Sequence, residues 1–143
     1  TEIFSSFIMK NKQTLRKSVN EIINFTKINN IKLALATSTT INNVEAVFKS
    51  LSDQISNEDF HFIGNRSLVK NEKPNPEIYK LTLEKLNLEP DNCLAIEDTE
   101  ESSKSAVSAG IKCIGFPGDY HSDDSFEMCI KKVKILDQSL FSL

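Results

Sequence analysis

Three groups of polar side chains have the residue types and spacing that could perform chemistry. The hydroxyl residues 37–39 follow the apolar letters LALA, and the carboxylates Glu97 and Asp98 follow CLAI. Lys73 lies between them in the sequence, in the loop motif KPNP. Hydroxyl and ammonium groups can hold phosphate oxygens, and paired carboxylates can hold Mg²⁺, which prefers oxygen ligands. Together the three groups predict a site for a phosphoryl group and a magnesium ion.

Each group taken alone also has an ordinary structural explanation. Ser38 and Thr39 can cap the following helix while they line a phosphate site, since the two roles are compatible. A single lysine in a loop is usually solvated, and Glu97-Asp98 before a helix can be favourable charge at the helix N-terminus. The prediction therefore depends on the order and spacing of the three groups rather than on any one of them.

The elements that must position these groups alternate along the chain. Amphipathic or small-residue stretches predict helices over 13–28, 41–51, 76–87, a stretch ending at Gly110, and 123–131. Short apolar runs predict strands in the run IKLALAT and over 60–64, 93–96, 112–116 and 133–136. Such alternation implies an α/β fold, a Rossmann-like open parallel sheet with helices on both faces. Because ligands bind beyond the carboxyl ends of such strands, the three polar groups are expected to face one crevice.

Composition narrows the classes of function. The chain has 143 residues, of which 39% are hydrophobic and 26% charged, a balance typical of one globular domain. A net charge of -3 argues against nucleic acid as a partner. No apolar run approaches the ~20 residues that span a bilayer, so no membrane partner is expected. Three cysteines without a CxxC pair favour a reduced, cytoplasmic setting.

The segments that carry the polar groups resemble the haloacid dehalogenase-like (HAD) hydrolase superfamily, in its phosphatase and β-phosphoglucomutase-like branch. The similar segments cover most of residues 13–140 and read NIKLALATSTTINNVEAVFKSL, KNEKPNPEIYKLTLEKLNLEPDNCLAIEDTEESSKSAVSAGIKCIGFPG and KILDQSL. The resemblance implies that Thr37 binds the phosphoryl group and that Lys73 neutralises the nucleophile and the phosphate. It also implies that Glu97 and Asp98 bind Mg²⁺.

The sequence departs from this family in one large respect and one small one. The family's nucleophile is the first Asp of a DxD motif, and no DxD occurs here. Residues 1–12 are therefore interpreted as a return segment from a missing helical cap, and 13–143 as the C-terminal part of the core. The central first strand would then be absent, leaving two inner strand edges unpaired. The small departure is Ser102, at a position where the family usually has glycine.

These observations predict a piece of a longer enzyme. The chain alone is expected to be inactive, and to be completed by a missing N-terminal segment or by a second copy. The resemblance implies a phosphatase acting on a small phosphorylated metabolite through an aspartyl-phosphate on an upstream Asp, with Lys73 and Thr37 as catalytic residues. A sugar-phosphate mutase of the same superfamily and a non-catalytic HAD-like binding protein remain alternatives. A signalling receiver domain does not fit, because its acids precede its threonine.

Overall fold

The fold is built around a parallel sheet of six strands. The computed structural model describes residues 2–5, 9–11, 14–15, 18–118 and 121–143. In spatial order the strands are β5 (Phe62–Gly64), β4 (Leu33–Ala36), β1 (Glu2–Ser5), β6 (Cys93–Glu97), β7 (Lys112–Gly115) and β8 (Lys131–Lys132). Every neighbouring pair in the sheet is parallel, as the alternation of elements predicts.

Helices connect these strands. The α-helices are α1 (Val19–Ile28), α2 (Ile41–Ser50), α3 (Glu77–Leu86) and α4 (Glu100–Ser108). Short 3-10 helices are η1 (Asn57–Asp59), η2 (Arg66–Leu68), η3 (Pro90–Asn92) and η5 (Gln138–Ser142), and β2 (Met9–Asn11) pairs antiparallel with β3 (Thr14–Leu15). None of the helices in the described ranges has the length and apolar character that a bilayer-spanning segment requires.

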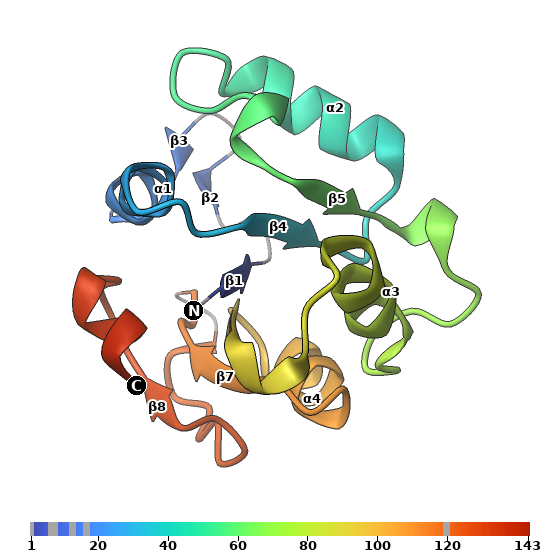
Figure 1. The fold of residues 1–143 in the computed structure, drawn as a ribbon, viewed down its shortest axis with the longest axis vertical. Coiled ribbons are helices and arrows are strands. Elements are labelled where there is room, and N and C mark those ends of the chain that lie inside the picture. The colour runs from blue at the N-terminus through green and yellow to red at the C-terminus, as the bar shows by residue number, and fades with distance from the viewer. Residues whose placement is uncertain (1, 6–8, 12–13, 16–17, 119–120) are drawn as a thin grey trace.

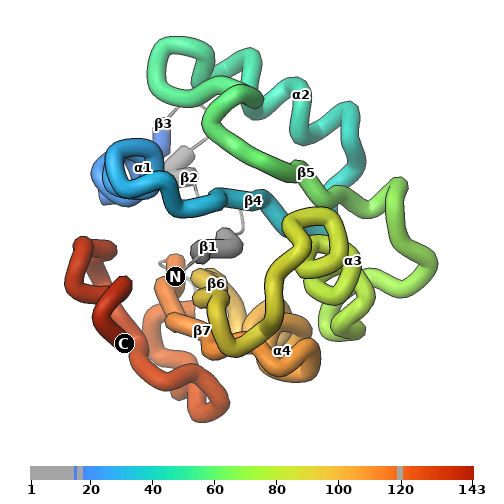
Figure 2. Tube along the Cα trace, in the orientation of Figure 1, coloured from blue at the N-terminus to red at the C-terminus, as the bar shows by residue number. Residues whose placement is uncertain are grey.

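The two faces of the sheet carry side chains of different size. Because side chains alternate along a strand, Leu33 and Leu35 of β4 lie on one face, and Ala34 and Ala36 lie on the other. The leucine face packs against α1, α2 and η5, whereas the alanine face packs against α3 and α4. Figure 1 and Figure 2 show α3 and α4 on one side of the sheet and α1 with the C-terminal segment on the other. The predicted open sheet with helices on both faces is therefore confirmed.

The centre of the sheet is filled, contrary to expectation. β1 lies between β4 and β6, with Ser5 opposite both Leu35 and Ile96. The backbone groups along the inner edges of β4 and β6 require partners, and the N-terminal strand provides them. The inner edges of β4 and β6 are therefore paired, by a strand that does not carry the DxD motif of the family's first core strand. Residues 1, 6–8 and 12 lie outside the described residues, so the assignment of 1–12 to a cap return segment stays a prediction.

Element boundaries are close to those expected, with two shifts. The first helix begins at Val19 rather than at residue 13, since Thr14–Leu15 form β3. The last strand lies at Lys131–Lys132 instead of 133–136. Gly110 has a φ of 86° just after α4, which confirms its predicted role as a left-handed helix end.

The predicted helix over 123–131 is absent. Phe126 has a φ of 51° and is buried, and its ring packs so tightly on Gly115 that a Cβ there would lie 2.6 Å away. Met128 and Ile130 are 41% and 48% exposed. A surface helix needs a continuous apolar stripe facing the core, but here a single phenylalanine anchors the segment. The chain therefore turns around Phe126 rather than coiling.

Candidate functional site

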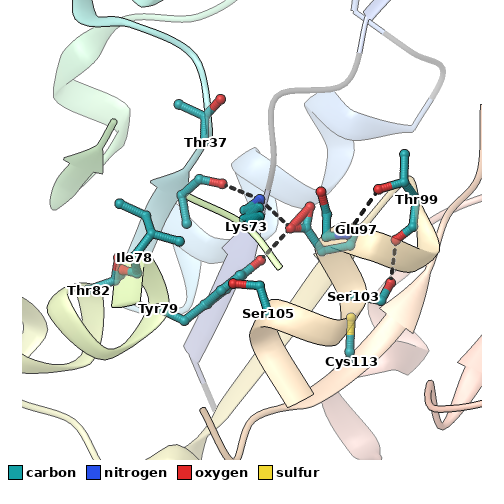
Figure 3. Close-up of polar contacts among 12 residues, drawn as sticks. Thr37, Lys73, Ile78, Tyr79, Thr82, Glu97, Thr99, Ser103, Ser105 and Cys113 are labelled. Carbon is teal, nitrogen blue, oxygen red and sulfur yellow. Dashed lines mark hydrogen bonds and ion pairs between the residues drawn. The ribbon is translucent and has the colours of Figure 1, made fainter. Parts of the chain in front are cut away.

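Lys73 lies at the centre of the candidate site. Its Nζ donates to the carbonyl oxygen of Ala36 (2.8 Å) and to Oε2 of Glu97 (2.5 Å) (Figure 3). The lysine side chain is only 4% exposed. Ala36 is the last residue of β4 and Glu97 is the last residue of β6. One ammonium group therefore joins the carboxyl ends of two strands, at the edge where this kind of sheet binds ligands.

The loop that carries Lys73 is tied to both helices of the alanine face. The Glu77 carboxylate accepts a hydrogen bond from the Lys70 backbone N–H (2.6 Å). Asn75 accepts from the N–H of Glu77 through its side-chain oxygen (2.9 Å), and its carbonyl accepts from the Ser105 hydroxyl (2.7 Å). Because α3 and α4 both hold this short loop, the Lys73 side chain is directed inward under the sheet edge.

Glu97 is fully buried, and two donors share its Oε2. The second donor is the hydroxyl of Tyr79, at 2.7 Å. Burial first, and then the charge of Glu97, raise the pKa of Tyr79 well above its ordinary value of 10, so the phenol keeps its proton and donates it. The Lys73 Nζ also lies 5.4 Å from the centroid of the Tyr79 ring. We call Lys73, Glu97 and Tyr79 the buried cluster.

Thr37 follows Ala36 directly and is half-buried. Its Oγ1 accepts a hydrogen bond from the Thr39 backbone N–H (3.1 Å), which leaves the hydroxyl hydrogen for another acceptor. Figure 3 shows the Thr37 hydroxyl directed away from the Lys73 ammonium. The structure thus places Thr37 beside the buried cluster, on the same edge of the sheet, without a direct bond between the two.

The remaining hydroxyl residues lead into α2. Thr40 is the N-cap, and its side chain accepts from the Asn43 N–H (3.4 Å), so neither Ser38 nor Thr39 is the cap. The Thr39 hydroxyl accepts from the Asn43 side chain (3.0 Å). Ser38 is exposed. The hydroxyls of 37–39 therefore lie just before a helix N-terminus, a position that favours anions.

Asp98 differs from its neighbour Glu97 in its surroundings. It is partly exposed, and no hydrogen bond or ion pair joins its side chain to the described residues. The next residue, Thr99, caps α4 by accepting from the N–H of Ser102 (3.1 Å). Ser102 therefore fits in the first helical turn, at the position where glycine was expected. Asp98 is left as a carboxylate available to a cation at the sheet edge.

The acidic groups fit part of a magnesium site. Within the part of the chain that the structure describes, no three His, Cys, Asp or Glu side chains gather around one point. Mg²⁺ commonly takes one or two carboxylates and keeps several waters, so a single accessible carboxylate is a sufficient contribution from this segment. Asp98 meets that description better than Glu97, whose Oε2 already binds two donors.

Tyr79 and Ser105 are the members of the site that sequence reasoning missed. The sequence places Tyr79 on the apolar face of its helix with Leu83 and Leu86, and all three are indeed buried. A buried tyrosine needs a partner for its hydroxyl, which is the one available signal. That partner is 18 residues away in sequence, so the pattern of the helix alone does not identify it.

Comparison with known proteins agrees with this arrangement. A family model described as haloacid dehalogenase-like hydrolase matches residues 2–116. The chain belongs to the haloacid dehalogenase-like hydrolase family. It is 33% identical over 126 residues to protein CbbY of Cereibacter sphaeroides, covering 88% of this chain and 55% of that protein. It is 38% identical over 112 residues to a phosphorylated carbohydrates phosphatase of Thermotoga maritima, covering 78% of this chain and 48% of that protein.

A solved structure from this family has the same fold. The crystal structure of a CbbY variant from Rhodobacter sphaeroides in complex with xylulose-(1,5)bisphosphate matches with a TM-score of 0.78 at 33% identity. The match covers 83% of this chain and 53% of that one. The chain thus spans about half the length of the relatives that it matches. One of these relatives is named as a phosphatase.

Proposed function

We propose that the complete protein is a Mg²⁺-dependent phosphatase that acts on a small phosphorylated metabolite, of the phosphorylated sugar class. The observation that carries this proposal is the Lys73 ammonium, buried at the sheet edge between Ala36 and Glu97. A fixed cation in a dry site stabilises the negative charge that develops on a transferring phosphoryl group. The sugar class is supported by the relatives, of which one is named a phosphorylated carbohydrates phosphatase and one binds xylulose-(1,5)bisphosphate.

Each residue of the site receives a role in this proposal. Lys73 neutralises phosphate oxygens, and Thr37 donates its free hydroxyl hydrogen to one of them. Ser38 and Thr39 line the phosphate site at the N-terminus of α2, where the helix dipole favours anions. Glu97 is a positioning residue because its carboxylate binds the ammonium group of Lys73, and Tyr79 positions that carboxylate in turn.

Asp98 is the residue that we expect to hold Mg²⁺, with Glu97 as a second predicted ligand. The ion, when bound, would offset negative charge on the phosphate and on the attacking group. The nucleophile in this proposal is an Asp upstream of the chain, which forms an aspartyl-phosphate. A missing N-terminal segment or a second copy would supply it. The cytoplasmic location expected from the cysteines stays a prediction.

The test requires the complete protein and a panel of sugar phosphates. Asp98→Asn should lower Mg²⁺-dependent release of inorganic phosphate by about 10²-fold or more, the size of losing one electrostatic contact to a transition state. The matched control is Asp91→Asn in η3, an exposed carboxylate before β6 rather than after it. Its turnover should equal that of the wild type. Equal turnover of the Asp98 variant would overturn the metal role.

The same assay separates the alternatives. Conversion of one sugar phosphate into its isomer, without release of inorganic phosphate, would identify a mutase. Binding of sugar phosphates without any turnover, in a complete protein that holds Mg²⁺, would identify a non-catalytic binding protein. Release of inorganic phosphate that depends on Lys73 supports the phosphatase.

A further inference from the structure

Two cysteines lie side by side on the alanine face of the sheet. Cys113 is in β7 and is fully buried, and Cys129 lies just before β8. The backbone N–H of Ile130 donates to the carbonyl of Cys113 (2.9 Å), which fixes the segment of Cys129 against β7. The Cys129 side chain packs against the same group of buried residues that contains Cys113. All three cysteines of the chain are free thiols.

The two thiols differ in accessibility. Cys129 is partly exposed, so a small reagent can reach its sulfur from solvent. Cys113 is 0% exposed. This asymmetry is the arrangement of a reactive thiol beside a resolving thiol. Neither sulfur takes part in the buried cluster or in the proposed phosphate site.

The pKa values of the two thiols are shifted in opposite directions. A hydrogen bond with the Cys113 thiol lowers the pKa of Cys129 to about 7, although burial and the charges of Glu97 and Glu100 act in the opposite direction. The same hydrogen bond, together with burial, raises the pKa of Cys113. Since the thiolate is the nucleophile, Cys129 is the sulfur that attacks and Cys113 is the one that keeps its proton.

We propose that Cys129 is a site of oxidation by hydrogen peroxide, and that Cys113 resolves it into an intramolecular disulfide. The sulfur of Cys129 attacks one peroxide oxygen, so that an S–O bond forms, the O–O bond breaks and the released hydroxide becomes water. Cys129 is then a sulfenic acid, oxidised by two electrons. The sulfur of Cys113 attacks it, the S–S bond forms, and the hydroxide that leaves takes the Cys113 proton as a second water.

The site of this modification adjoins the proposed metal ligand. Cys113 contacts Ser103, whose hydroxyl donates to the carbonyl of Thr99 (2.8 Å) in the first turn of α4. Figure 3 shows Cys113 beside Ser103 and below this turn. The proposal does not depend on the phosphatase function, because it concerns only the two thiols and peroxide.

The test treats the folded chain with hydrogen peroxide and maps the product by mass spectrometry. The protein should lose the mass of two hydrogen atoms, a peptide pair linked through Cys113 and Cys129 should appear, and dithiothreitol should reverse both changes. Cys129→Ser should abolish the cross-link. Cys113→Ala should leave Cys129 as a sulfenic acid that dimedone traps. Cys93→Ala, which removes the buried cysteine of β6, is the matched control and should react as the wild type does.

Three results would overturn the proposal. They are a disulfide that includes Cys93, a disulfide only between two molecules, and consumption of Cys129 to sulfinic acid with no cross-link. Circular dichroism of each variant shows whether it folds. The wild-type experiment decides the matter without any substitution, because the linked peptide pair is its direct product.

Discussion

A lysine side chain lies at each end of strand β4, and the two ammonium groups have different partners. Lys32 precedes β4, and its Nζ donates to the carbonyl of Leu86, the last residue of α3 (2.9 Å). Lys73 binds the carbonyl of Ala36 at the other end in the same way. Within the described ranges, Lys32 has no carboxylate partner and is half-buried, whereas Lys73 pairs with the buried Glu97.

The difference separates a structural cation from a functional one. A cation at a helix C-terminus is favourable on its own, because it complements the helix dipole and remains in water. A buried ion pair is costly to desolvate, and an apolar pair of similar volume is often as stable. Stability alone therefore does not explain Lys73 and Glu97, whereas a site for phosphate does. Strongly perturbed ionisable groups such as Tyr79 gather at such sites.

The largest effect is expected from Lys73→Met, which removes the cation and keeps the volume. Glu97 would then be a buried carboxylate without its counter-charge, and breaking such a pair costs about 3–5 kcal/mol. The free energy of unfolding, measured by urea denaturation at neutral pH, should fall by that amount.

The double variant Lys73→Met with Glu97→Gln sharpens this test. It removes both charges, so it should recover much of the free energy of unfolding that Lys73→Met loses. Neither single substitution is expected to recover it. A double variant that is no more stable than Lys73→Met would show that the loss comes from packing and not from the unpaired charge.

A smaller loss is expected from Tyr79→Phe, which removes one hydrogen bond to the Glu97 carboxylate and keeps the ring. Hydrogen bonds to charged groups contribute about 1.5–3 kcal/mol. Thr82→Val is the matched control, because it removes the neutral hydrogen bond from the buried Thr82 hydroxyl to the Ile78 carbonyl on the same helix. Its loss should be nearer ~1 kcal/mol. Equal losses in the two variants would argue against an ionised Glu97.

The raised pKa of Tyr79 predicts how stability depends on alkaline pH. Above pH 10 the phenol ionises in the unfolded chain, while the folded chain keeps its proton. The unfolded state therefore binds fewer protons, and the free energy of unfolding falls as the pH rises above 10. Tyr79→Phe should lose less of this free energy over the same interval. Tyrosinate absorbance followed through alkaline unfolding provides an independent measurement. A phenol that ionises before the protein unfolds would contradict the prediction.

The sequence predicts those parts of the site that follow from strand ends. Ala36 and Glu97 end apolar runs, and parallel strands bring such ends to one edge, so the meeting of Lys73 with that edge could be anticipated. The partner of Tyr79 could not be anticipated in this way. A helical pattern shows that a side chain is buried, but it does not show which group its hydroxyl contacts. The same limit explains why Ser105 was missed.

The errors in the fold have equally local causes. The apolar residues of segment 123–131 have a spacing that resembles that of a helix, but only Phe126 is buried. Its packing on Gly115 is a tertiary contact, which the local pattern does not reveal. The central strand was not expected because Glu2–Ser5 lacks the DxD motif that would have marked it. Its parallel pairing with β4 and β6 depends on residues far away in sequence. The local sequence pattern predicted most of the helices and strands. The turn around Phe126 and the central strand depend on contacts between residues far apart in the sequence.

The smallest effect is expected from Lys32→Met, and it decides whether the comparison of the two lysines holds. Lys32 donates to the end of α3 from a half-buried position, so its loss should cost about 0.3–1 kcal/mol, the usual contribution of a cation at a helix C-terminus. Urea denaturation beside Lys73→Met measures the difference directly. Because both variants lose a hydrogen bond to a main-chain carbonyl, the excess loss in Lys73→Met reports the buried charge of Glu97. If the two losses were equal, Lys73 would be a structural cation like Lys32, and its burial would no longer support a phosphate site.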